Sequence, residues 1–275
     1  MTSPDPSPAP LGRVCICVPT YDERLTLPKI VARIRAAVPA ADVLILDDNS
    51  PDGTGEVADR LTAQDPHVHV LHRPGKQGLG PAYLAGFAWA QEQGYDAVVE
   101  IDADGSHQPE QLPALLDTAE WTGADLVIGS RWVPGGSVHN WPAHRRLLSV
   151  GANTYARMAL GIPVRDSTAG FRVYRLAALR LMSTDAVASQ GYCFQIDLTV
   201  RALEQGLHVV EVPIAFVERE EGTSKMSDSI VREAMVKVGV WGVRRRVRQV
   251  RRLLGEQRAA RDRSRWHTLG GEREP

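Results

Sequence analysis

The sequence predicts an α/β domain built on a Rossmann-like, mostly parallel sheet with helices on both faces, and three observations lead to this class. Short apolar stretches rich in Val and Ile alternate with helical patterns along residues 13–130. These stretches show little polar alternation, as expected where both faces of a parallel sheet are covered. The length of 275 residues suits one such domain with extensions and allows a substantial core.

The predicted elements follow one another regularly through the first half of the chain. We predict strands at about 13–19, 42–47, 68–72, 97–102 and 125–130, with helices at about 24–38, 54–64, 79–93 and 109–121. The loop VPGGSVHNWP then precedes a helix predicted at about 143–160. The stretch RDSTAGFRVYR leads into further helix and strand segments that end near VEVPIAFVER.

The start of the chain and its cysteines indicate the compartment. Residues 1–12 have neither the basic start nor the apolar stretch of a signal peptide, and we expect a disordered tail there. No run approaches the roughly 18 apolar residues of a membrane-spanning helix. The cysteines, Cys15, Cys17 and Cys193, are expected to be buried thiols without a disulfide. We therefore predict a cytoplasmic protein whose main domain covers residues 13–225.

A basic, periodic segment follows the main domain at residues 226–275. The formal net charge is only -1, yet residues 244–265 hold ten arginines against Glu256 and Asp262. One helical face is formed by Val236, Val240, Val243, Val247, Val250 and Leu254. This pattern favours an amphipathic helix that lies on the membrane surface. The competing interpretations are a helix docked on the main domain by its valine face and a helix that binds a membrane protein; no nucleic-acid partner is predicted.

Asp102 and Asp104, in the stretch EIDADGSHQPE, are candidate ligands for a cation. Residues i and i+2 of an extended chain point to one side, so both carboxylates should emerge together where the predicted strand ends. A solvated turn is the plainer interpretation. IDADGS also resembles the strand-end Asp-x-Asp-Gly-Thr of the haloacid dehalogenase phosphatases. A calcium loop is excluded, because His107 and Pro113 stand where it needs glycine and glutamate.

Polar residues also follow other predicted strands, and the ends of parallel strands lie at one edge of a sheet. The strand ends read Pro19-Thr20-Tyr21-Asp22-Glu23, Asp47-Asp48, Asp102-Ala103-Asp104 and Gly129-Ser130-Arg131. Clustered acids repel one another unless cations or hydrogen-bond donors compensate them, as a divalent metal with a diphosphate would. The joint pattern therefore favours a ligand site over a set of unrelated turns.

Longer motifs point to a known family. The chain contains VPTYDER, LILDDNSPDGT, GLGPAYLAGF, IDADGSHQP, IGSRWVPGG, HNWPAHRR and VEVPIAFVEREEGTSK, in this order from about residue 13 to 230. It resembles the inverting family 2 glycosyltransferases, and among them the dolichol- or polyprenol-phosphate mannose synthases. The resemblance implies the GT-A fold of nucleotide-diphospho-sugar transferases, with GDP-mannose as donor and a polyprenyl phosphate as acceptor.

The resemblance also implies roles for individual residues. The nucleoside would be held by Pro19, Tyr21, Glu23, Leu46 and Asp48, and the metal, Mg²⁺ or Mn²⁺, by Asp102 and Asp104 beside Ala103. The remaining phosphate contacts would come from Arg131, Arg219 and Lys225, and the acceptor phosphate would meet Arg131 and Arg145. Asp104 and Arg131 would act in catalysis. Such a metal neutralises the charge that grows on the departing nucleoside diphosphate.

The acceptor chemistry is consistent with the absence of a recognisable general base. A phosphate monoester has a second pKa near 6, so a lipid phosphate is already an anionic nucleophile at pH 7 and needs cations and positioning. We therefore predict a peripheral enzyme on the inner face of the cell membrane. Three alternatives remain at this point: another donor such as UDP-glucose, a metal-dependent phosphatase, and a non-catalytic membrane-binding module.

Overall fold

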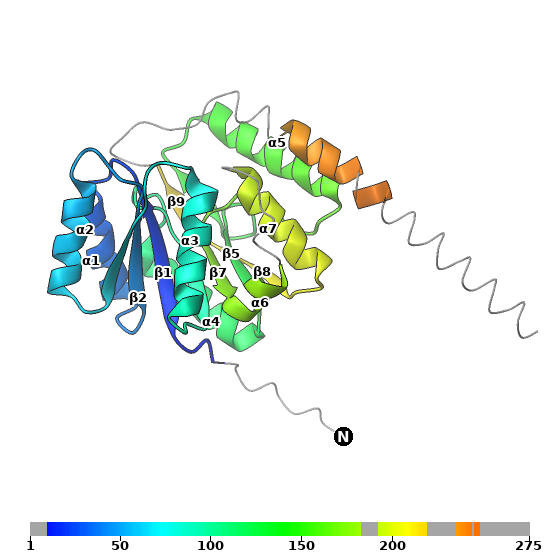
Figure 1. Cartoon of the computed structure of the whole chain (residues 1–275). Helices are drawn as coiled ribbons and strands as arrows, with labels where there is room; N and C mark the ends of the chain where they lie inside the picture. The colour runs from blue at the N-terminus through cyan, green and yellow to red at the C-terminus, as the bar shows by residue number, and fades with distance from the viewer. Residues whose placement is uncertain (1–9, 183–191, 219–234, 244, 248–275) are drawn as a thin grey trace, which may run out of the picture.

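A seven-stranded sheet forms the centre of the structure, a computed structural model that describes residues 10–182, 192–218, 235–243 and 245–247 (Figure 1). The strand order is β3-β2-β1-β4-β7-β5-β8. The strands are β1 Val14–Thr20, β2 Asp42–Asp47, β3 Val68–His72, β4 Ala97–Glu100, β5 Leu126–Ser130, β7 Arg172–Arg175 and β8 Val209–Pro213. Only β7 runs antiparallel to its neighbours in this sheet, β4 and β5. The predicted mostly parallel sheet is thus confirmed.

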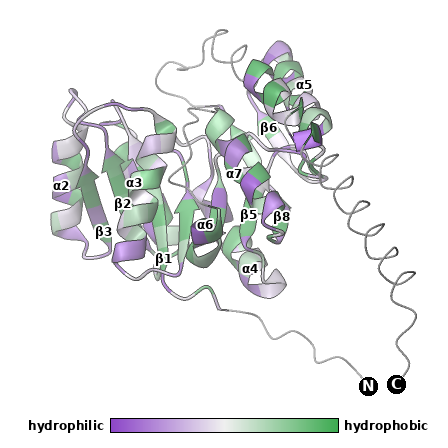
Figure 2. Cartoon of the chain, turned by 45° about the vertical axis from the view of Figure 1, so that its right-hand side comes forward, coloured by the Kyte–Doolittle hydropathy of each residue, from purple (hydrophilic) through white to green (hydrophobic). Residues whose placement is uncertain are grey.

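Helices cover both faces of this sheet, as the uninterrupted apolar strands predict. The helices are α1 Leu27–Ala37, α2 Thr54–Gln64, α3 Leu79–Glu92, α4 Leu112–Thr122, α5 Ala143–Leu160, α6 Leu176–Leu181 and α7 Tyr192–Glu204. The short 3-10 turn η1 Pro109–Gln111 precedes α4. One face packs on α1, α2 and α4, and the other on α3, α6 and α7. Figure 2 shows the hydrophobic strands enclosed between these layers.

A second, two-stranded parallel sheet joins part of the predicted loop VPGGSVHNWP to part of the stretch VEVPIAFVER. It pairs β6 Ser137–His139 with β9 Ala215–Val217. Val217 N donates to Ser106 O at 3.1 Å, which ties β9 to the loop that carries Asp102 and Asp104. The small sheet therefore connects this loop to the segment that leads into α5.

A C-terminal helix, described at 235–243 and 245–247, lies beside α5 (Figure 1). Val238 is 2% exposed and belongs to a small core with Ala156 and Leu160 of α5. A Cβ on Gly242 would lie 2.4 Å from the Ala159 carbonyl oxygen, so the close approach of the two helices requires glycine there. This helix therefore docks on the main domain.

The docked face is not the one that the valine pattern predicts. Val238 and Trp241 pack inward, while the opposite face, with Val236, Val240, Val243 and Val247, is exposed. Docking by the valine face, one of the two competing interpretations, is therefore wrong, because Val238, Trp241 and Gly242 on the other side pack against α5. Val250, Leu254 and eight of the ten arginines, at 244, 248, 251, 252, 258, 261, 263 and 265, lie outside the described residues. No helix in the described ranges has the length and apolar character needed to span a bilayer.

Candidate active site

The polar residues after β1, β2, β4 and β5 share one edge of the sheet, as predicted. Asp48 N donates to Thr20 O at 3.1 Å, and Arg73 N donates to Asp47 O at 2.8 Å, so the segments after β1, β2 and β3 are joined. On the other side of the edge, Ile214 N donates to Ser130 O at 3.1 Å. The fold therefore brings these segments to the place where a doubly wound sheet binds ligands.

The loop after β4 presents the two candidate metal ligands. Asp104 Oδ1 accepts a hydrogen bond from Ser106 N at 2.9 Å. The Asp102 backbone N–H donates to His107 Nδ1 at 3.4 Å, and about a third of the Asp102 side chain is exposed. Ala103, between them, is buried. The loop is therefore anchored by its backbone while the Asp102 carboxylate remains accessible.

His107 supports this loop from beneath as a neutral imidazole. Its ring lies 5.2 Å from both the Phe171 and the Phe216 ring centroids. Burial lowers the pKa of His107 to about 4, although the nearby Asp104 carboxylate opposes this. A neutral ring has one nitrogen that accepts, as Nδ1 does here from Asp102. Sequence reasoning assigned His107 no role, because an isolated histidine after an acidic loop has no distinctive spacing.

The donor set at this loop fits a hard divalent cation. Carboxylate oxygens are the ligands that Mg²⁺ and Mn²⁺ prefer, and Mg²⁺ is often held by one or two carboxylates together with substrate phosphates and water. Asp102 and Asp104 match that pattern. In the part of the chain that the structure describes, no group of three or more His, Cys, Asp or Glu side chains could hold a metal ion by itself.

The side of the edge predicted for the nucleoside contains two residues that the motif reading missed. Asp48 forms a buried ion pair with Arg73, whose Nη2 also donates to Gln77 Oε1 at 3.1 Å. Burial raises the pKa of Asp48, and the Arg73 charge opposes that rise. Lys76 Nζ lies 3.9 Å from the Tyr21 ring centroid, in cation-π geometry. The loop RPGKQG therefore covers this side.

The other residues predicted to contact the nucleoside differ in their burial: Glu23 lies in a loop, Pro19 is partly buried, and Leu46 lies in the core. Glu23 Oε2 accepts from Thr26 Oγ1 at 2.7 Å in the loop after β1. Pro19 is partly buried near the end of β1. The Leu46 side chain is fully buried in the core against α3, where a Cβ on Gly86 would lie 2.9 Å from it. A role for Leu46 at the nucleoside would have to use its backbone, and all these assignments stay predictions.

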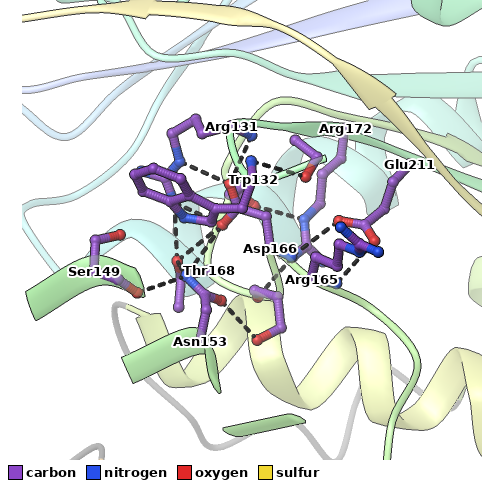
Figure 3. Close-up of polar contacts among 12 residues, drawn as sticks. Arg131, Trp132, Ser149, Asn153, Arg165, Asp166, Thr168, Arg172 and Glu211 are labelled. Atoms are coloured by element: carbon purple, nitrogen blue, oxygen red, sulfur yellow. Dashed lines mark hydrogen bonds and ion pairs between the residues drawn. The ribbon is translucent and has the colours of Figure 1, made fainter. Parts of the chain in front are cut away.

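Two arginines stand at the opposite side of the edge, each held by a carboxylate. Arg131 Nε and Nη2 donate to the two oxygens of buried Asp166, both at 2.7 Å (Figure 3). Arg145, in the first turn of α5, forms an ion pair with Glu218, and its Cζ lies 4.4 Å from the Trp141 ring centroid. Both arginines, which the resemblance predicts at the acceptor, are thus anchored in place. Arg219 and Lys225 lie outside the described residues.

The open, mostly parallel sheet, with two aspartates after its fourth strand and arginines across the same edge, fits the GT-A fold of nucleotide-diphospho-sugar transferases that the resemblance implies. The model of glycosyl transferase family 2 matches residues 15–182. The chain belongs to this family and is a glycosyltransferase.

Similar proteins extend beyond the family model. The chain is 56% identical over 243 residues to polyprenol monophosphomannose synthase of Mycolicibacterium smegmatis, covering 88% of this chain and 91% of that protein. It is 55% identical to undecaprenyl-phosphate mannosyltransferase of Micrococcus luteus, covering 88% and 99%. Among solved structures, glucosyl-3-phosphoglycerate synthase from Mycobacterium tuberculosis in complex with Mn²⁺, UDP-glucose and phosphoglyceric acid has a TM-score of 0.63 at 19% identity. The superposition covers 84% of this chain and 80% of that chain, and this similarity supports the fold.

Proposed function

We propose that this protein transfers mannose from GDP-mannose to a polyprenyl phosphate, with inversion at the anomeric carbon, giving polyprenyl-phosphate-mannose and GDP. The observation that carries the proposal is the similarity, along most of the chain, to two mannosyltransferases whose names specify a polyprenyl acceptor. The arginines opposite the acidic loop suit such an acceptor, because a guanidinium pairs well with phosphate oxygens.

In this proposal each part of the strand-end edge has one task. Asp102 and Asp104 hold Mg²⁺ or Mn²⁺, which compensates the charge on the departing diphosphate. Pro19, Tyr21, Glu23, Leu46 and Asp48 hold the nucleoside, and Arg219 and Lys225 add phosphate contacts. Arg131 and Arg145 place the acceptor phosphate, which attacks as an anion and needs no proton acceptor at neutral pH.

A transfer assay tests this function directly. Purified protein is given GDP-mannose, GDP-glucose, UDP-glucose or UDP-mannose with a polyprenyl phosphate and Mg²⁺ or Mn²⁺, and the lipid product is identified by mass. We expect transfer from GDP-mannose only. Transfer from UDP-glucose would show a glycosyltransferase with a different donor and would refute the GDP-mannose assignment. Release of inorganic phosphate without transfer would favour the phosphatase alternative.

Arg145 gives a test of the acceptor side. Replacing Arg145 with alanine should raise the KM for polyprenyl phosphate about tenfold or more, because a charge-assisted hydrogen bond is lost. The affinity for GDP-mannose, measured by calorimetry, should stay nearly unchanged. Arg146→Ala is the matched control, since Arg146 is the next residue of the same helical turn and is exposed. An equal loss of both affinities in Arg145→Ala would refute the assignment.

We also propose that the protein lies on the inner face of the cell membrane by means of its C-terminal helix. Further exposed apolar side chains lie on neighbouring α5, at Leu147, Leu148, Val150 and Met158. Arg246 donates to the Met158 carbonyl oxygen at 3.2 Å, and Arg245 lies 4.0 Å from Glu204. Because Arg245 and Arg246 already contact the protein, attraction to an anionic membrane would depend on the remaining arginines of the segment 244–265.

Point substitutions on the exposed valine face test this attachment without disturbing the docked face. Val240→Glu combined with Val243→Glu should abolish most sedimentation with anionic vesicles, because it places charge where apolar surface would enter the interface. GDP-mannose affinity should persist. Leu181→Glu, at another exposed position, serves as control. Unchanged sedimentation of the double variant in low salt would instead favour α5 or a membrane-protein partner.

A further inference from the structure

The carboxylate of Asp166 is organised around Arg131. Asp166 is fully buried, and Arg131 reaches it three times, through its backbone N–H at 3.0 Å and through Nε and Nη2 at 2.7 Å each. Arg131 Nη2 also donates to Thr168 Oγ1 at 3.0 Å. The side chain and the backbone of Arg131 are therefore both fixed by one acidic residue.

Neighbouring elements hold Asp166 itself in place (Figure 3). Asn153 of α5 donates from Nδ2 to Asp166 Oδ1 at 3.3 Å and to Thr168 at 3.0 Å. Glu211 of β8 accepts from the backbone N–H groups of Arg165 and Asp166 at 2.8 and 2.9 Å. The loop backbone is thus secured by Glu211, while the Asp166 side chain remains directed at Arg131.

Aromatic rings enclose the guanidinium further. Arg131 Cζ lies 5.7, 5.6 and 5.5 Å from the ring centroids of Trp132, Trp141 and Phe216. Burial alone would raise the pKa of Asp166, but the Arg131 charge and its hydrogen bonds outweigh this and lower it. The pair is therefore ionised at neutral pH, and the guanidinium has one defined orientation.

We propose that Asp166 is a positioning residue for the transfer reaction. It holds the guanidinium of Arg131 in one orientation before the substrate binds, so that Arg131 loses no further side-chain entropy when it meets a substrate phosphate. The inference rests on the proposed function, in which Arg131 contacts phosphate. A long arginine side chain loses considerable rotamer entropy when it is immobilised, so fixing it before the substrate arrives favours binding and catalysis. A buried ion pair is by itself weak evidence for a stabilising role.

A double-mutant cycle tests this role. Asp166→Asn keeps the side-chain shape and removes its charge; Arg131→Lys keeps the positive charge and removes the paired geometry. We expect Asp166→Asn to lower kcat/KM for polyprenyl phosphate about 10- to 100-fold, by analogy with the loss of an outer-shell partner of a metal-binding side chain. In the Arg131→Lys background, the same change should cost no more than about twofold.

Glu211→Gln is the matched control because it weakens the same loop without touching Arg131. Glu211→Gln should lower kcat/KM for polyprenyl phosphate by the same factor in the presence and in the absence of Arg131→Lys. Thr168→Val gives a milder variant if Asp166→Asn does not fold. It removes one contact to Arg131 together with the Thr168 contacts to Asn153 and Asp166, and its smaller effect should shrink in the same background. If Asp166→Asn lowered kcat/KM by the same factor in the wild-type and in the Arg131→Lys backgrounds, its role would be merely structural and the proposal would be overturned.

Binding measurements separate this inference from the proposed reaction. The same proteins are titrated with farnesyl phosphate, which requires no transfer. If the wild-type protein binds it and the cycle is coupled, but no mannose is transferred, the proposed reaction fails and the positioning role stands. If farnesyl phosphate binds with equal affinity to the wild-type protein and to the Asp166→Asn protein, the positioning role is refuted whatever the transfer assay shows.

Discussion

Replacing Asp104 with asparagine is expected to lower the rate of mannose transfer about 100-fold or more. The substitution removes both an oxygen ligand and the negative charge that retains a divalent cation beside the diphosphate, and losing one transition-state electrostatic contact typically has an effect of this size. Because Asp104 Oδ1 accepts from Ser106 N, asparagine can keep that contact through its amide oxygen. The loop should therefore hold its shape while the reaction slows.

Two controls make this result specific to the metal site. Asp117→Asn removes an exposed carboxylate on α4 and should transfer mannose at the wild-type rate. The melting temperature should be nearly the same for both variants. Near wild-type transfer by the Asp104→Asn protein, or undiminished transfer by the wild-type protein in excess EDTA, would contradict the assignment.

Replacing Glu100 with glutamine is expected to remove a large part of the pH dependence of stability. Glu100 is fully buried, Gln195 Nε2 donates to its Oε2 at 2.8 Å, and its Oε1 has no hydrogen-bond partner among the described residues. Burial raises the pKa of Glu100 to about 8, although the charge of Arg172 opposes the rise. The folded protein holds Glu100 in its protonated form. The stability that this contributes is fully present below the pKa of Glu100 in the unfolded chain, near 4.5, and is lost as the pH rises through the folded pKa of about 8.

The expected magnitude follows from that shift. As the pH rises from 4.5 to 8.5, the free energy of unfolding of the Glu100→Gln protein should increase relative to that of the wild type by on the order of 4 kcal/mol. Urea titrations in EDTA at several pH values measure this difference. Glu92→Gln, at an exposed position on α3, should follow the wild-type curve. Parallel curves for Glu100→Gln and the wild type would show that Glu100 titrates normally.

The parallel part of the fold could be predicted because its elements follow simple local rules. The strand predicted at 42–47 matches β2, in which Val43, Leu44 and Ile45 are fully buried, and the helix predicted at about 143–160 matches α5. Apolar runs between turn residues specify such strands without knowledge of their neighbours. Because parallel strands end at one edge, the sequence also predicted which polar residues gather there.

The antiparallel strand β7 could not be predicted in the same way. Its residues, RVYR, include two arginines, and Arg172 is fully buried. The Arg172 guanidinium donates to the carbonyl oxygens of Ala169, Ser167 and Gln195, which compensate its burial. These partners come from loops and from α7, so no periodicity in the sequence indicates them.

The candidate site was predicted better for its acids than for the residues that support them. Asp102 and Asp104 follow a recognisable strand, whereas Asp166 lies in a loop where an aspartate usually indicates a turn. Its partner Arg131 is distant in sequence and close only in the folded chain. Likewise, the pairing of Arg73 with Asp48 depends on where β3 ends beside β2.

The position of β7 has a consequence for the order of folding. It lies between β4 and β5 but follows both in the chain, pairing Val98 with Tyr174 and Val127 with Val173. While residues 1–130 emerge from a ribosome, β4 therefore has only β1 beside it, and the strand that will join it to β5 has not been made. Closing such long loops slows folding more than forming local helices does. The edge that bears Asp102 and Asp104 thus acquires its second supporting strand late, after α5 has been synthesised.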